Sequence, residues 1–321
     1  MQRLIGQYSG SEHGTLIIAL AAMHGNEPAG VRALRTLFDM LDSEPLKNPH
    51  FQFRGRLVGF IGNMQALERK IRFVKKDLNR ELFKENIERL KAFHPDENDT
   101  HFTASNELLF EDLELKELMQ DIENEILIYK PKKLILLDLH TTSASGGIFT
   151  LVSESMDSVK IASELHAPVV KGFIKGIGGS TLHYFTENNT GVPTTALAFE
   201  AGQHDDPFSS RRTIAWMVNC LRSVGCVDTR DIENRHEEIL RGYSKSLPKV
   251  VQLIGVHKIM QGDGFKMVAG FQNFQAVKKG DILAHDKNGA IAAPENCLIL
   301  MPLYQLQGSD GFFLVREVSS C

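Results

Sequence analysis

The feature that most constrains the fold is a regular alternation between short apolar runs and longer segments with helical periodicity. The apolar runs, which we predict to be buried strands, cover residues 15–23, 56–63, 132–140, 146–152 and 194–202. The segments with helical periodicity cover residues 28–41, 106–130 and 207–225. Because strands that alternate with helices usually form parallel sheets covered by helices, the sequence predicts an α/β fold. We expect a mainly parallel, mixed sheet with helices on both faces.

The pattern changes from about residue 247. Short β-rich runs are separated there by glycines and by an Asn-Gly pair, as in "GFKMVAGFQNFQAVKKGDILAHDKNGAIAAP". Turn residues at such short intervals are typical of compact all-β structure. We therefore predict two domains, a large α/β domain over residues 1–246 and a small C-terminal β-rich domain over residues 247–321.

Composition and charge exclude several classes of protein. The 36 basic and 40 acidic residues are mixed along the 321-residue chain, so neither a nucleic-acid footprint nor a membrane-surface patch follows. The N-terminus lacks a signal pattern, and the best apolar run, residues 16–23, is too short to span a bilayer. Four cysteines without a C-x-x-C pair fit a reducing compartment. We expect a cytoplasmic protein, and the sequence is compatible with a homodimer.

A histidine and a glutamate stand three residues apart in "AAMHGNEPAG", where the first buried strand ends. This spacing, His24 and Glu27, occurs a second time as His94 and Glu97 in "FHPDENDT", a polar segment with no strand before it, which we interpret as a solvated loop. His24 and Glu27 differ because an apolar strand carries them to the carboxyl edge of the sheet, where sites of α/β folds lie. Taken alone, the pair is equally compatible with a hydrogen-bonded turn.

A second histidine arrives at the same edge in "LILLDLHTTSASGG". His140, together with His24 and Glu27, completes the two histidines and one carboxylate that a catalytic zinc uses, with the fourth position left to water. Asp138 precedes His140 by two residues, so it lies on the same side of the strand and is placed to accept the other ring N–H. The alternative, a buried histidine that is satisfied within the core, is weakened by the presence of both sites together.

Two further segments carry polar residues suited to catalysis. Glu200 follows an apolar run in "ALAFEAGQ", where an unpaired carboxylate is costly to bury; beside a zinc ion it is the natural general base, and otherwise a surface or salt-bridged residue. In "RFVKKDLNRELF", Arg72, Asn79 and Arg80 lie in a polar segment whose default interpretation is a solvated face. An arginine beside an asparagine also suits the binding of a substrate carboxylate.

Four motifs, in this order, resemble the succinylglutamate desuccinylase and aspartoacylase family, whose members are related to the zinc carboxypeptidases. The motifs are "HGNEPAG", "DLNR", "DLHTTSASGG" and "FEAGQ", and together they extend over residues 24–203. A β-rich tail after the catalytic domain is also typical of that family. The order and spacing of the four motifs are specific, although no single motif is.

The resemblance implies a role for each candidate residue. It implies one zinc ion per chain, held by His24, Glu27 and His140. It also implies that Glu200 is the catalytic carboxylate and that Arg72 polarises the scissile carbonyl. Asn79 and Arg80 would bind the α-carboxylate of an N-acyl amino acid.

The sequence departs from the family pattern at two points. Aspartoacylases carry an arginine about ten residues before the catalytic glutamate, where this chain has Thr190. Their substrate-contacting tyrosine in the tail corresponds to Phe312 or Phe313. Both departures argue against recognition of a second substrate carboxylate, such as that of aspartate. In the glycine-rich segment "KGIGGSTLHYF", which we interpret as a mobile loop, His183 and Tyr184 are further candidates for substrate contact.

The sequence therefore predicts a zinc-dependent amidohydrolase that removes the acyl group from a small N-acyl amino acid. One alternative is a zinc carboxypeptidase acting on short peptides. Another is a non-enzymatic binding protein of the same fold, which would be expected to lose a metal ligand or Glu200, and this chain retains all four residues. Serine-hydrolase and dinucleotide-binding functions are not supported, because no G-x-S-x-G or G-x-G-x-x-G motif is present.

Overall fold

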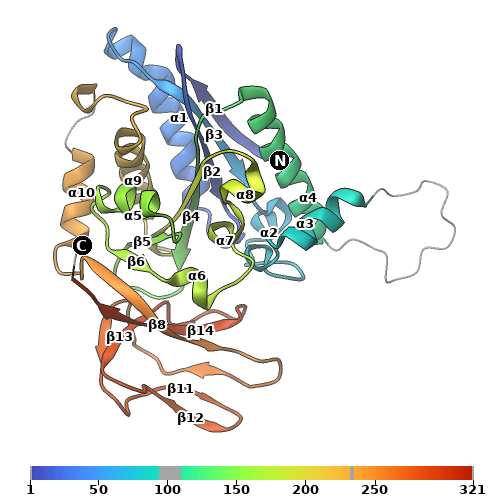
Figure 1. The fold of residues 1–321 in the computed structure, drawn as a ribbon. Helices are drawn as coiled ribbons and strands as arrows, with labels where there is room; N and C mark the ends of the chain where they lie inside the picture. The colour runs from blue at the N-terminus through green and yellow to red at the C-terminus, as the bar shows by residue number, and fades with distance from the viewer. Residues whose placement is uncertain (1, 94–109, 232–234, 320–321) are drawn as a thin grey trace, which may run out of the picture.

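The structure is a computed structural model that describes residues 2–93, 110–231 and 235–319. His94 and Glu97 lie outside the described residues, so their interpretation as a solvated loop stays a prediction. Figure 1 shows an open central sheet with helices on both sides and a group of C-terminal strands at one end. The expected α/β fold, a mainly parallel mixed sheet with a small β-rich region, is confirmed.

An 11-stranded sheet runs through the molecule in the order β1-β3-β2-β4-β7-β5-β6-β8-β14-β13-β10. Its first seven strands are β1 (Leu4–Ser9), β3 (Arg54–Ile61), β2 (Glu12–Ala21), β4 (Leu134–Thr142), β7 (Thr194–Gln203), β5 (Phe149–Val152) and β6 (Val169–Lys171). The central strands β3, β2, β4 and β7 are parallel, whereas β1 and β5 pair antiparallel with β3 and β7. The carboxyl ends of β2, β4 and β7 therefore meet at one edge of the sheet.

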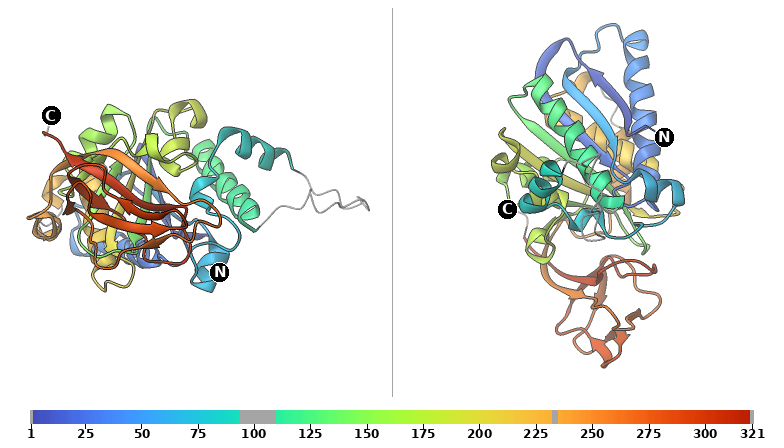
Figure 2. Two further views of the ribbon diagram at one scale, coloured as in Figure 1. Left: turned by 90° about the horizontal axis from the view of Figure 1, so that it is seen from below. Right: turned by 90° about the vertical axis from the view of Figure 1, so that its right-hand side faces the viewer.

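Helices cover the sheet because its central strands are apolar on both faces. Along β2, alternate side chains enter two different cores: Ile17 and Ala19 join one, and Ile18 and Leu20 join the other. The first core is completed by α1 (Ala29–Lys47), α5 (Met156–Ser163), α9 (Ser209–Ser223) and α10 (Arg235–Ser244). The second is completed by α3 (Lys84–Ala92), α4 (Phe110–Tyr129), α6 (Phe173–Gly176) and α7 (Thr181–Tyr184). Figures 1 and 2 show α1 and α4 on opposite sides of the strands.

Shorter helical segments connect these elements. They are α2 (Met64–Arg69), η1 (Leu78–Arg80), α8 (Glu187–Thr190) and η2 (Thr229–Asp231). Of these, η1 carries two of the predicted site residues. Asp77 begins η1, because its side chain accepts a hydrogen bond from the backbone N–H of Asn79. This cap fixes the direction in which the "DLNR" motif leaves the preceding loop.

The C-terminal strands continue the large sheet. They are β8 (Val250–Lys258), β14 (Asp310–Glu317), β13 (Cys297–Leu300) and β10 (Gln275–Val277), and β8 pairs parallel with β6. A separate three-stranded sheet consists of β12 (Gly289–Ala292), β11 (Ile282–Asp286) and β9 (Lys266–Met267). These strands enclose a third, smaller core. Figure 1 shows them below the end of β4, so this region borders the carboxyl edge of the main sheet.

Two observations concern the class of protein. In the three ranges that the structure describes, every helix is too short or too polar to cross a membrane. Three of the four cysteines, Cys220, Cys226 and Cys297, lie within those ranges, and all three are buried free thiols.

Candidate active site

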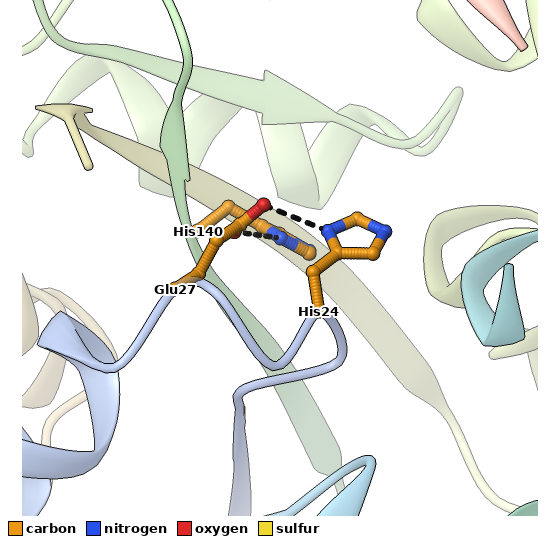
Figure 3. A group of neighbouring side chains, drawn as sticks. All are labelled: His24, Glu27 and His140. Atoms are coloured by element: carbon orange, nitrogen blue, oxygen red, sulfur yellow. Dashed lines mark hydrogen bonds and ion pairs between the residues drawn. The ribbon is translucent and has the colours of Figure 1, made fainter. Parts of the chain in front are cut away.

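The residues expected to bind metal lie at the carboxyl edge of the sheet. His24 and Glu27 occupy the loop between β2 and α1, and His140 lies near the end of β4. Glu200, near the end of the neighbouring strand β7, is the direct backbone partner of His140 in the sheet register. Figure 3 shows that the Glu27 carboxylate contacts one ring nitrogen of His24 and one of His140.

The three side chains form a compact donor group. One ligand atom from each of His24, Glu27 and His140 lies within 4.8 Å of the others, and all three side chains are buried. Nδ1 of His24 lies 2.9 Å from Oε1 of Glu27, and Nδ1 of His140 lies 2.9 Å from Oε2. Both imidazoles therefore turn the same ring nitrogen toward a shared carboxylate. Two imidazoles and one carboxylate in this arrangement fit a zinc site with an open position.

The other nitrogen of each ring contacts a second carboxylate. Nε2 of His24 lies 3.0 Å from Asp77, and Nε2 of His140 lies 2.9 Å from Asp138, the contact expected from the sequence. Although burial alone would raise it, the pKa of Asp77 is held well below its usual range by Arg72 and His24. A charged acceptor on the outer nitrogen fixes the orientation of an imidazole and directs the lone pair of the other nitrogen toward a metal.

The loop between His24 and Glu27 depends on a close backbone approach. A Cβ atom at Gly25 would lie 2.0 Å from the backbone of Ala66 in α2, so only glycine fits there. The Gly25 N–H donates to the backbone oxygen of Arg72, which connects the loop of His24 and Glu27 to the segment that carries Arg72. Gly25 of "HGNEPAG" thus has a packing role, because any larger residue at this position would clash with α2.

Glu200 is buried, and one of its carboxylate oxygens, Oε2, has no hydrogen-bond partner among the described residues. Burial raises the pKa of Glu200 to about 8; His140 opposes this shift, and the nearby carboxylates of Glu27 and Asp138 add to it. A carboxylate in this state accepts and releases a proton close to neutral pH.

Arg72 is fixed by an ion pair beside the donor group of His24, Glu27 and His140. Its guanidinium donates twice to Oδ2 of Asp77, at 2.8 and 3.2 Å, and its NH1 lies 3.6 Å from Glu27. The loop before η1 is held in turn by the buried Glu111 of α4, whose carboxylate accepts hydrogen bonds from the backbone N–H groups of residues 74–76. A positive charge is thus placed next to the donor group.

Asn79 and Arg80 reach the same site from η1. The Asn79 amide donates to Asp138 at 3.1 Å and accepts from the backbone N–H of Thr181 at 2.9 Å. Arg80 donates from NH2 to Asp310 on β14 at 2.5 Å, while its Nε has no partner among the described residues. Most of the Asn79 amide is therefore engaged within the protein, whereas Arg80 keeps a buried free donor.

All seven predicted site residues line one cavity with about 750 Å³ of empty space, its open mouth included. Residues 301–310, after β13, supply one wall of the cavity, and Phe313 of β14 also lines it. Phe312 instead stacks on His257. Of the other candidates, Thr190 lies on α8 away from the cavity, and neither His183 nor Tyr184 is among its lining residues.

Several lining or supporting residues were missed by the sequence analysis. Asp77 is the first residue of the motif "DLNR", but nothing in the sequence indicated its contact with His24. Thr181 donates to Asp138 at 2.6 Å, and His204 contacts Thr141 and Gln305. Asp310 comes from the far end of the chain. Only the tertiary fold brings these residues to the site.

Solved structures of other proteins share this fold. Among curated proteins, none matches the chain. Solved structures with the same fold include a succinylglutamate desuccinylase/aspartoacylase from Rhodobacter sphaeroides, with a TM-score of 0.62, 14% identity, and coverage of 96% of this chain and 86% of that one. A product-bound ectoine utilization protein, EutE (DoeB), from Ruegeria pomeroyi has a TM-score of 0.59, 17% identity, and coverage of 96% and 87%. A succinylglutamate desuccinylase from Vibrio cholerae has a TM-score of 0.58, 15% identity, and coverage of 95% and 82%.

The sequence itself matches a family model. Residues 13–217 match the model described as the succinylglutamate desuccinylase/aspartoacylase catalytic domain. The matched region is more than half of the chain and contains all seven predicted site residues. This chain therefore belongs to the succinylglutamate desuccinylase/aspartoacylase family.

Proposed function

We propose that the protein is a zinc-dependent deacylase that hydrolyses the amide bond of an N-acyl amino acid. The observation that carries the proposal is the buried donor group of His24, Glu27 and His140, with a carboxylate on the outer nitrogen of each imidazole. These three residues would hold the zinc ion. A zinc ion in such a site supplies Lewis acidity, which activates water and polarises a carbonyl group.

Glu200 is proposed as the general base and acid. As a water oxygen attacks the amide carbon, the free carboxylate oxygen of Glu200 takes the proton from that water. When the C–N bond breaks, Glu200 returns the proton to the leaving amine, which departs as the free amino acid. The raised pKa of Glu200, caused first by burial, suits a group that must both accept and donate a proton near neutral pH.

The two arginines are proposed to bind charge at opposite ends of the reacting group. Arg72, held by Asp77, would stabilise the negative charge that develops on the carbonyl oxygen. Arg80, with its free buried Nε, would anchor the substrate α-carboxylate, and Ser180, whose hydroxyl also has no partner among the described residues, lines the same cavity. Asn79 would complete this anchor next to Arg80 while it holds Asp138 and Thr181 in place.

The alternatives are less well supported. A carboxypeptidase needs an open cleft for a peptide, whereas residues 301–310 close one side of this cavity. Gln307 pins that wall through hydrogen bonds with the backbone of Arg72 and Phe73. A non-enzymatic binding protein would have no need of a buried, unpaired Glu200, whose retention has a cost in stability.

Substitution of Glu200 tests the proposed mechanism. Glu200→Gln keeps the size of the side chain but removes its basicity, so kcat toward the best N-acyl amino acid should fall by about two to four orders of magnitude. Zinc content and thermal stability should stay close to those of the unmodified protein. Steady-state kinetics and elemental analysis provide the measurements. A variant that lost its zinc would make Glu200 a ligand, and one with substantial kcat would refute its role as the base.

A further inference from the structure

One part of the cavity wall is apolar. Six lining residues belong to one packed hydrophobic cluster: Leu151, Phe173, Ile177, Leu182, Ala198 and Phe313. The rings of Phe173 and Phe313 lie against each other, with their centroids 5.0 Å apart. Since these side chains are packed within the core, the tertiary fold holds this apolar wall in place.

The apolar wall and Arg80 are adjacent. The segment that contains Ile177 and Leu182 runs against Arg80 so closely that a Cβ atom at Gly179 would lie 2.3 Å from the Arg80 backbone oxygen. On the other side, Arg80 pairs with Asp310, which is on the same strand as Phe313. A carboxylate bound by Arg80 would therefore have hydrophobic neighbours.

The cavity has little positive charge for a second carboxylate. Among the described residues that line it, Arg72 and Arg80 are the only arginines, and none is a lysine. Arg72 is paired with Asp77, and Arg80 is paired with Asp310. A second substrate carboxylate would have to lose its water against apolar side chains without gaining a cation, which is costly.

We infer that the amino acid released by this enzyme has an apolar side chain, such as that of leucine or phenylalanine. The inference rests on the proposed function, because it assumes that Arg80 binds the α-carboxylate. The Cα atom carries both the carboxylate and the side chain, so an anchored carboxylate places the side chain beside Ile177, Leu182 and Phe313. These three residues would then determine specificity against aspartate and glutamate.

Binding and hydrolysis are measured separately, so that the two proposals can fail independently. Calorimetric titration of the zinc-loaded Glu200→Gln variant, in which turnover is strongly reduced, gives the Kd of N-acetyl-leucine, N-acetyl-phenylalanine, N-acetyl-aspartate and N-acetyl-glutamate. The unmodified protein is assayed for hydrolysis of the same compounds. We expect the two apolar compounds to bind at least about tenfold more tightly and to be hydrolysed with the higher kcat/KM.

A matched pair of variants identifies the pocket. Ile177→Ala should raise the Kd of N-acetyl-leucine about tenfold and leave that of N-acetylglycine unchanged, because only the leucine side chain reaches the wall. Val170→Ala, in the same hydrophobic cluster but outside the cavity, should change neither Kd. If Val170→Ala raised the Kd of N-acetyl-leucine as much as Ile177→Ala does, the assignment of the pocket would be wrong.

The remaining outcomes separate the two proposals. Equal or tighter binding of the acidic compounds would overturn the apolar pocket, and their hydrolysis would still support deacylase function. Selective binding of the apolar compounds without hydrolysis of any compound would overturn the proposed function and retain the pocket. Absence of binding by all four compounds would overturn both.

Discussion

At the scale of single residues, the aspartates that contact the two histidines allow a direct test of the proposed metal site. Asp77 and Asp138 each contact the outer nitrogen of one imidazole. Replacing either by asparagine keeps the shape but removes the charge, so zinc affinity should fall by about 10–100-fold. His24→Ala, which removes a ligand, should lose zinc altogether.

Competition against a chelator of known affinity gives the zinc Kd of each variant. Asp39→Asn, at an exposed position on α1, is the matched control and should bind zinc like the unmodified protein. Unchanged zinc affinity in both Asp77→Asn and Asp138→Asn would show that these carboxylates do not support the metal ligands.

The sequence pattern predicted that His24, Glu27 and His140 lie together, because these residues follow strands. His24 and His140 end apolar runs, and the carboxyl ends of parallel strands share one edge, so their proximity was predictable without a structure. The contact between Asp77 and His24 was not predictable in this way. It depends on how the loop before η1 folds back over the sheet, and loop geometry leaves no periodic signal in the sequence.

At the scale of secondary-structure elements, the first turn of α4 supports the loop before η1, which carries Arg72. The Glu111 carboxylate accepts hydrogen bonds from three consecutive backbone N–H groups, the shortest being 2.6 Å from Val74 N. In Glu111→Gln, one of these oxygens is replaced by an NH₂ group that faces other donors. The free energy of unfolding should therefore fall by about 1–3 kcal/mol, and kcat should fall because Arg72 lies on this loop.

Urea unfolding and steady-state kinetics measure the two effects. Glu88→Gln on α3 is the control, since its side chain is exposed and its pairing with Lys84 at 3.9 Å contributes little. A Glu111→Gln variant as stable as the Glu88→Gln variant would mean that the carboxylate does not organise the loop.

The buried thiols of α9 and the turn after it predict a pH dependence of stability. Burial raises the pKa of Cys226 to about 12 and also raises that of Cys220, from an ordinary value of 9.0. Because the fold favours the neutral thiols, their contribution to stability is complete below pH 9 and is lost as the pH rises above 9. The free energy of unfolding should decline over this range, and less so in Cys220→Ala and Cys226→Ala.

Thiol labelling gives an independent measurement. In a Cys321→Ser background at pH 8, a thiol reagent should label the folded protein slowly and the urea-unfolded protein completely, because the three remaining thiols are buried. Rapid labelling of Cys220 or Cys226 in the folded protein would contradict the prediction.

The positions of the buried strands were predicted more readily than the pairing between strands. Apolar runs revealed β2, β3, β4, β5 and β7, because burial on both faces leaves an uninterrupted hydrophobic signal. The edge strand β1 and the three-residue β6 escaped notice, since they are half exposed or very short. The continuation of the sheet from β6 into β8 also left no signal, because backbone pairing does not depend on particular side chains.

At the scale of the whole molecule, the proposed boundary between residues 246 and 247 raises the question of whether the two parts fold independently. The C-terminal strands share both backbone pairing and a hydrophobic core with the α/β part. Strand β8 pairs with β6, and Leu300, Phe313 and Val315 belong to the same core as Leu136 of β4. Residues 301–310 also line the cavity. The boundary stays a prediction of composition, but these contacts connect the two sides energetically.

We therefore expect the chain to unfold as one cooperative unit. Truncation to residues 1–246 would expose the edge of β6 and the apolar side chains that face Phe313 and Val315, and exposed strand edges with apolar surface favour aggregation. Differential scanning calorimetry of the full chain should show a single transition, and the truncated chain should fail to give a folded, zinc-binding protein. Two separate calorimetric transitions, or a soluble 1–246 fragment with the zinc affinity of the full chain, would show instead that the C-terminal strands form an autonomous domain whose contribution is limited to the wall of the cavity.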